Sequence, residues 1–258
     1  MTQRRTEGAA YDRLKLVSSF GPSESFCRVL REDADLAASV PAAQRDRAIA
    51  ECVAPLVGLP RGSWNGLPDS RGDAIGLLVL DGLMVRRVGI DGRFGAELIG
   101  EGDLLRPWQE DLSVTTASGW RVLRPTRLAV LDAEVTRNVA IYPSLVAALV
   151  DRTLNRARTL AAMLAIVHHA RVEARLELLL WLLADRWGKV TTDGVRLPLK
   201  LTHAVIGELI AARRPTVTVG LSSLARRGVM TPLPDGGWRL HGDPPGELRF
   251  LSPTRMVL

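Results

Sequence analysis

Arginine and threonine side chains gather near the C-terminal end of the chain, at Arg213, Arg214, Thr216 and Thr218. An arginine guanidinium can bind O6 and N7 of a guanine together, which discriminates against other bases by about 1–3 kcal/mol. Threonine hydroxyls suit phosphate oxygens. Two adjacent arginines on their own are more often a solvated pair, so a nucleic-acid role depends on the elements that carry them.

The surrounding spacing predicts two helices joined by a tight turn. Thr202 is a suitable N-cap for a helix that runs to about Ala211. Pro215 is favoured in the first turn of a second helix, which would end at Gly228. A β-hairpin over 230–240, with Pro-Asp-Gly-Gly at its turn, would complete a winged helix-turn-helix.

This arrangement would bring further side chains to a DNA surface. The second helix of such a motif enters the major groove by its N-terminus, where free N–H groups and the helix dipole favour phosphate. Thr202 and His203, at the start of the first helix, would touch the DNA backbone. Double-stranded DNA is therefore the expected partner.

Most of the excess positive charge lies in the last third of the chain. The net charge is +6, and residues 171–258 hold 13 Arg and Lys against 8 Asp and Glu, whereas residues 1–170 are nearly neutral. A basic domain favours a polyanionic partner, with nucleic acid first. The alternative is a basic surface that only aids solubility.

Other classes of site are not supported by the sequence. Cys27 and Cys52 are too few for a disulfide framework or an iron–sulfur cluster, and we expect both to be small buried hydrophobic residues. The four histidines and two cysteines show no metal-site spacing. No nucleophile elbow, Walker loop or Rossmann fingerprint indicates an enzyme. We expect no catalytic activity, no metal and no cofactor.

The sequence also argues against a membrane partner. No apolar run reaches the roughly 18 residues that a membrane span needs. The arginines near the N-terminus are not followed by the apolar segment of a secretory signal. A cytoplasmic protein is expected.

An antiparallel β-domain is predicted to follow an N-terminal helical segment. The N-terminal segment is expected over 1–58, with helix over 24–58. Over 59–132, short apolar runs alternate with Gly-containing turns such as Asp81-Gly82 and Asp91-Gly92, which favours a small jelly roll or β-roll. The expected strands are 75–80, 83–88, 96–99, 112–116, 120–123 and 127–131.

A change of period at Asp132 predicts one long helix over 133–170, with an early proline at Pro143. Its apolar and small side chains recur in alternating steps of four and three, a heptad pattern that would let two helices approach closely. We expect this stripe to pair with a second subunit; the alternative is a helix packed on its own domain. With a further helix over 172–187 and the winged helix-turn-helix domain over 171–258, the fold class is α+β. The dimerisation stripe comprises Val146, Val150, Thr153, Ala157, Leu160, Leu164 and Val167.

Three motifs carry a resemblance to a known family. They are Leu201-Thr202-x-x-x-Ile206-Gly207-x-Leu209-Ile210, Arg214-x-Thr216-Val217, and Leu221-x-x-Leu224-x-x-x-Gly228-Val229. Together with the order β-roll, long helix and winged helix, they resemble the cyclic-AMP receptor / fumarate–nitrate regulator (Crp/Fnr) family of bacterial transcription factors. The resemblance covers nearly the whole chain beyond residue 60.

The resemblance implies a homodimer on a roughly palindromic DNA site, with an effector in each β-roll and RNA polymerase as a candidate partner. Arg214 matches the guanine-reading arginine of the family, and Arg213 and Thr216 match phosphate-contacting positions. Pro215 and Val219 stand where the cyclic-AMP receptor has base-reading Glu and Arg. A different DNA sequence is therefore expected.

The cyclic-nucleotide cassette of the family, Gly-Glu-Leu and then Arg-Ser/Thr-Ala, is degenerate here. Gly102-Asp103-Leu104 is followed by Pro107, and no Arg-Ser-Ala occurs. Glu110-Asp111 lies near where a phosphate would need a cation, and Leu160-Ala161 replaces polar residues that face adenine in the cyclic-AMP receptor. We expect an effector other than cyclic AMP, or none.

Arg106 and Trp108 are unusual in a turn and could line a pocket for an anionic or aromatic effector. The alternative is a packed tryptophan and a surface arginine, and Arg86-Arg87 are expected to face solvent. A second hypothesis for the whole chain is a winged helix that binds protein instead of DNA. A steep loss of DNA binding with salt would distinguish the two.

Overall fold

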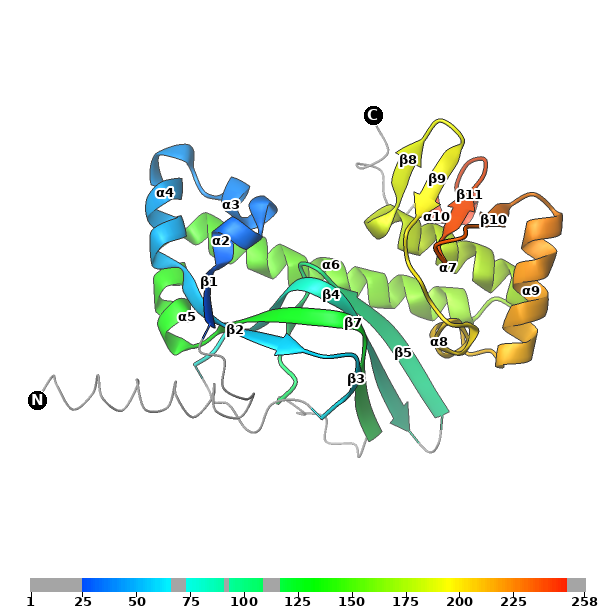
Figure 1. Ribbon diagram of the computed structural model, residues 1–258, viewed down its shortest axis with the longest axis horizontal. Helices are drawn as coiled ribbons and strands as arrows, with labels where there is room; N and C mark the ends of the chain where they lie inside the picture. The colour runs from blue at the N-terminus through cyan, green and yellow to red at the C-terminus, as the bar shows by residue number, and fades with distance from the viewer. Residues whose placement is uncertain (1–24, 66–72, 91–92, 109–116, 250–258) are drawn as a thin grey trace, which may run out of the picture. The chain divides into compact units, whose positions relative to one another are not determined.

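The computed structural model describes residues 25–65, 73–90, 93–108 and 117–249, which belong to two compact units (Figure 1). The first unit holds the residues up to Ala157 except Arg93–Ala96, and the second holds Arg93–Ala96 and the residues from Arg158 onward. The described strands form one seven-stranded and one four-stranded sheet.

The seven-stranded sheet is antiparallel throughout its described pairings and has the order β1-β2-β7-β4-β5, with β3 paired to β7 and β6 to β4. Its two central strands, β4 and β7, lie side by side along most of their length (Figure 1). The prediction of an antiparallel β-domain in an α+β fold is confirmed. The strands are β1 (Ser25–Arg28), β2 (Val53–Leu59), β3 (Gly62–Trp64), β4 (Gly76–Ile90), β5 (Arg93–Gly100), β6 (Leu104–Leu105) and β7 (Ala117–Leu131).

The expected hairpin turn at Asp81-Gly82 is wrong, because both residues lie inside β4. The register with β7 shifts at this point, as at a β-bulge. Gly82 has φ +116°, and a Cβ there would lie 2.5 Å from Thr126 Cα. Glycine thus allows β7 to pass close by. The strands expected over 120–123 and 127–131 are likewise one strand; the turn at 91–92 and the strand over 112–116 fall outside the described residues.

The helix expected over 24–58 is only partly correct. Three short helices, α2 (Val29–Glu32), α3 (Ala34–Ser39) and α4 (Ala42–Glu51), lie between β1 and β2. The run from Val53 onward is a strand because it pairs with β7 far along the chain, for example Leu56 with Ala129.

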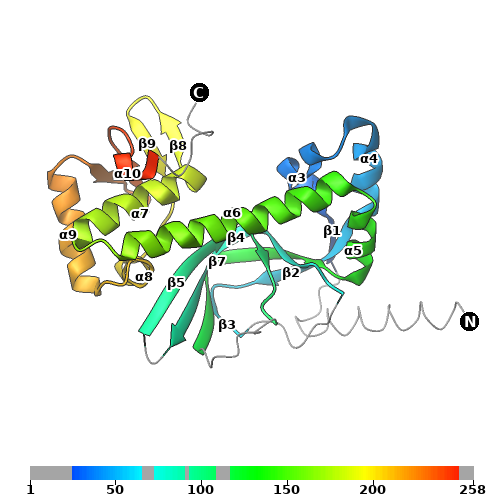
Figure 2. The ribbon, with the colours of Figure 1, turned by 180° about the vertical axis from the view of Figure 1, so that it is seen from behind.

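The single helix expected over 133–170 is in fact two helices, α5 (Ala133–Ala140) and α6 (Pro143–Val167). The Asp132 side chain caps α5 by accepting hydrogen bonds from the N–H groups of Glu134 and Val135. Pro143 opens α6, where its missing N–H costs nothing. The part of α6 up to Ala157 belongs to the first unit, and the helix is drawn in green in Figure 2.

The first unit has two apolar cores. One joins α2–α6 to the sheet through residues such as Leu36, Leu78 and Leu145, and the other fills the β-roll around Met84. Cys27 and Cys52 are free and buried, as predicted. Burial raises the pKa of each thiol to about 11, so neither is reactive at neutral pH.

The second unit contains the predicted winged helix-turn-helix. Its sheet has the order β10-β11-β9-β8, and α8 and α9 lie next to each other beside it (Figure 2). The elements are α7 (Val172–Trp187), β8 (Lys189–Thr191), β9 (Gly194–Leu197), α8 (His203–Leu209), α9 (Arg214–Arg226), β10 (Met230–Pro232), β11 (Trp238–Leu240) and α10 (Gly246–Arg249).

Candidate nucleic-acid interface

The turn between α8 and α9 is fixed by local backbone geometry. Thr202 caps α8 as predicted, its Oγ1 accepting a hydrogen bond from Val205 N–H at 3.3 Å. Ala211 takes a positive φ of 52°, and Ala212 N–H donates to the Gly207 carbonyl at 2.9 Å. A Cβ on Gly207 would lie 2.5 Å from the Ala212 carbonyl oxygen, so only glycine lets the turn fold back this closely.

The two helices are held together by apolar side chains on their facing sides. The far end of α9 is closed by Gly228, with φ +71°, in a Schellman motif: Gly228 N–H donates to the Ala225 carbonyl and Val229 N–H to the Leu224 carbonyl. The packing of the apolar side chains between α8 and α9 determines which side of α9 faces outward. The buried residues of the pair are Val205, Ile206, Leu209, Val217, Leu221 and Leu224.

The N-terminal end of α9 presents two arginines to solvent. Arg213 is the N-cap residue and Arg214 the first helical residue, and both are exposed. No carboxylate in the described part of the chain pairs with either guanidinium. Pro215 and Thr216 beside them are also exposed. Four of the residues predicted to contact DNA therefore lie together at this end of α9: Arg213, Arg214, Pro215 and Thr216.

Thr218 and His203 connect the two helices. The Thr218 hydroxyl donates to the Arg214 carbonyl oxygen at 3.1 Å, and His203 Nδ1 lies 2.8 Å from the same hydroxyl oxygen. Which atom donates in the His203–Thr218 contact depends on the tautomer of the ring. Thr218 thus connects α9 to α8 through His203, which the sequence did not reveal.

The dimerisation stripe predicted on α6 is mostly exposed. Val150 is 51% exposed and Leu164 is 64% exposed. Thr153 and Ala157 are also exposed, whereas Val167 is half-buried. Leu154, which the heptad analysis omitted, adds a further apolar side chain at 47% exposure. A row of exposed apolar side chains along one helix is typical of an interaction surface.

Two arginines on α6 hold this helix against the first unit. Arg152 forms a two-pronged ion pair with Asp33, with Nη2 donating to Oδ1 at 2.7 Å. Arg156, one turn later, binds both carboxylate oxygens of Glu97 and donates to the Leu104 carbonyl at 2.9 Å. Neither arginine was predicted from the sequence; their signal there is a spacing of four, roughly a quarter-turn around the helix from the stripe.

A group of charged and aromatic side chains lies together beside the core of the β-roll. The Arg86 guanidinium lies 5.3 Å from the ring centroid of Trp120 and 3.6 Å from the Glu97 carboxylate. Trp120 in turn meets Trp64 edge to face at 5.4 Å. The expectation that Arg86 faces solvent is therefore wrong, because the alternation along β4 places it on the same face as Met84 and opposite Trp120.

The two candidate effector residues both make contacts within the chain. Arg106 is exposed and donates to the Ala74 carbonyl at 2.8 Å. Trp108 is half-buried and packs against the core of the β-roll. Both fit the alternative of a surface arginine and a packed tryptophan.

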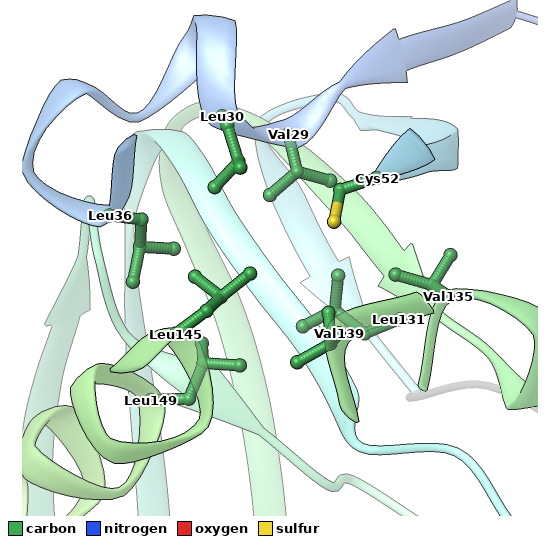
Figure 3. Close-up of a pocket in the computed structure, with 9 residues that line it drawn as sticks. All are labelled: Val29, Leu30, Leu36, Cys52, Leu131, Val135, Val139, Leu145 and Leu149. Carbon is green, nitrogen blue, oxygen red and sulfur yellow. The ribbon is translucent and has the colours of Figure 1, made fainter. Parts of the chain in front are cut away.

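A small cavity in the first unit is lined by neither of these residues (Figure 3). It has a volume of about 10 Å³, which is room for one water at most, and no lining side chain carries an oxygen or nitrogen. It is therefore a packing gap and not an effector site. Its lining residues are Val29, Leu30, Leu36, Cys52, Leu131, Val135, Val139, Leu145 and Leu149.

Neither a metal centre nor a membrane span is found within the described ranges. No helix there combines the length and apolar character needed to cross a bilayer. No three His, Cys, Asp or Glu side chains of these residues are grouped as metal ligands.

Comparisons with known proteins agree with this architecture. Residues 174–241 match the Crp-like helix-turn-helix domain family. None of the curated protein sequences matches the chain. Among solved structures, a CooA mutant from Carboxydothermus hydrogenoformans has a TM-score of 0.60 at 16% identity, covering 77% of this chain and 88% of its own.

Two further structures extend the likeness. CprK complexed with OCPA has a TM-score of 0.54 at 17% identity, covering 83% of this chain and 95% of its own. TTHB099, a CRP-family transcriptional regulator from Thermus thermophilus, has a TM-score of 0.50 at 19% identity, covering 78% of this chain and 98% of its own. The chain therefore carries a Crp-like helix-turn-helix domain over residues 174–241, and its fold is similar to that of these solved structures.

Proposed function

We propose that the protein acts as a homodimer that binds a roughly palindromic DNA sequence through α9. The observation that carries this proposal is the pair of exposed guanidinium groups, Arg213 and Arg214, at the N-terminus of α9. Arg214 reads a guanine, while Arg213, Thr216, Thr202 and His203 hold phosphates. Thr218 contributes by fixing His203.

The proposed dimer forms along the exposed apolar stripe of α6. Val146, Val150, Leu160 and Leu164 recur with heptad spacing and lie exposed in a single chain, which supports burial against a second copy of the helix. Arg152 and Arg156 lie outside this stripe and hold the helix to its own unit through Asp33 and Glu97.

The proposed effector differs from cyclic AMP or is absent. Glu97 already pairs with Arg156 and lies 3.6 Å from Arg86 within the β-roll, so an anionic ligand there must compete with Glu97 for these arginines. The similar CprK structure contains OCPA, which supports ligand binding in a protein of this fold.

Selection of DNA fragments by the purified protein tests the proposal. We expect enrichment of one palindromic motif, because two copies of α9 related by two-fold symmetry read two half-sites. We expect affinity for the selected duplex to fall at least tenfold between about 50 and 200 mM salt, since each phosphate contact releases counterions. Selection without any shared motif, or affinity insensitive to salt, would contradict DNA reading. An affinity that is insensitive to salt would favour a protein partner that contacts the exposed Val219.

Charged substitutions in the stripe test the dimer. The double variant Val150→Glu/Leu164→Glu is expected to sediment as a monomer and to lose about 100-fold in operator affinity, because the two half-sites are no longer linked. Val190→Glu, at an 87% exposed valine of β8, is the matched control and should remain a dimer. A wild-type protein that sediments as a monomer at micromolar concentration would refute the proposed interface.

A further inference from the structure

An exposed apolar pair lies on the outer side of α9. Val219 is 65% exposed, and Pro215, four residues earlier, is exposed as well. Side chains at this spacing are neighbours on a helix surface. They form one small apolar surface on the helix that also carries Arg214.

The residues around this surface are not the ones that helix stability alone would favour. Thr216, Val217, Thr218 and Val219 are all β-branched, and such residues are weaker helix formers than alanine, leucine or arginine. Only Val217 is buried, so packing accounts for one of the four. Neither helix stability nor packing accounts for the three exposed β-branched residues, which fits a helix face that contacts a partner.

The neighbouring hydroxyl groups are turned back onto the helix. Thr218 donates to the Arg214 carbonyl at 3.1 Å, and Ser222 donates to the Thr218 carbonyl at 3.0 Å. The single proton of each hydroxyl is thus committed to the backbone. Next to Val219 the helix consequently presents methyl and methylene groups instead of hydrogen-bond donors.

We propose that Val219, with Pro215 beside it, recognises a thymine in each half-site by contact with its 5-methyl group. This methyl is the only apolar group that the four standard base pairs present in the major groove. The inference rests on the proposed DNA-reading function and adds the chemistry of one base position, where contact between methyl groups replaces hydrogen bonding.

A methyl scan of the selected operator tests this inference. Each thymine of both half-sites is replaced in turn by deoxyuridine, which keeps the base pair and removes only the methyl group. For the wild-type protein we expect one symmetric thymine position at which the replacement weakens binding about fourfold per half-site. In Val219→Ala, binding to the thymine and deoxyuridine duplexes should agree at that position. Val190→Ala, at the exposed valine of β8, should retain the wild-type ratio.

Two results would overturn the inference while leaving DNA reading intact. One is a motif in which no thymine position responds to deoxyuridine, and the other is a response that persists unchanged in Val219→Ala. Failure to select any motif would overturn the proposed function and this inference together. Val219→Ala introduces a better helix former at an exposed position, so an unfolded variant is not expected, and circular dichroism checks this.

Discussion

Arg214→Ala is expected to abolish sequence-selective DNA binding and to leave a weak, salt-dependent affinity for any duplex. The guanidinium is exposed at the first residue of α9 and has no carboxylate partner among the described residues. A bidentate contact with guanine is worth about 1–3 kcal/mol, and a two-fold operator has two such contacts. The affinity for the selected duplex should therefore fall by about 30-fold or more, as measured by fluorescence anisotropy.

The control for this experiment is Arg226→Ala, which removes an exposed arginine from the opposite end of the same helix. It should keep the preference for the selected duplex over a scrambled one. Both variants should unfold at the wild-type temperature, because neither side chain is buried. An Arg214→Ala protein that still prefers the operator by the wild-type ratio would refute guanine reading by this residue.

Arg156→Ala is expected to destabilise the first unit by about 2–4 kcal/mol. The substitution leaves the Glu97 carboxylate, only 10% exposed, without the guanidinium that binds both of its oxygens. Removing one partner of a fully buried pair costs about 3–5 kcal/mol, and the figure is reduced here because Arg156 is 19% exposed. Urea denaturation followed by near-UV circular dichroism measures the loss.

Three further variants test whether the geometry of this pair is responsible. Arg156→Lys keeps the charge but loses the planar fork, so it should be intermediate in stability. Arg156→Met combined with Glu97→Gln removes both charges of the pair and should recover part of the loss, since only the partly exposed Arg86 then lacks a carboxylate. Arg47→Ala, which breaks the exposed Arg47–Glu51 pair, should have little effect. Equal losses for Arg47→Ala and Arg156→Ala would contradict a special role for Arg156.

Residues that are far apart in the sequence connect the N-terminal segment to the rest of the first unit. Tyr142 donates a hydrogen bond to Glu51 at 2.6 Å, and Asn138 donates to the Glu51 carbonyl at 2.9 Å. The hydrogen bond from the Tyr142 hydroxyl is the main cause that lowers the pKa of the Glu51 carboxyl, and the hydrogen bond from Arg47 lowers it further. These contacts connect α4 to α5 and to the start of α6, although nothing in the sequence pairs the segments.

The sequence alone determined the C-terminal part of the protein. The N-cap at Thr202, the proline at the start of α9 and the glycine that ends it act within a few residues of chain. The apolar faces of α8 and α9 follow from helical periodicity within these two short helices. Such short-range rules fix both the winged helix-turn-helix and the exposure of its arginines, so the candidate DNA-binding residues were accessible without coordinates.

Only the tertiary structure decided the β-roll and its attachment to α6. Asp81-Gly82 has the composition of a hairpin turn, yet it lies within β4 because Thr126 of β7 passes against Gly82. Glu97 and Arg156 are 59 residues apart, and Asp33 and Arg152 are 119 residues apart. Pairings over such distances depend on how strands and helices pack together in space. No local periodicity or turn preference specifies them, which is why Arg152 and Arg156 emerged only from the fold.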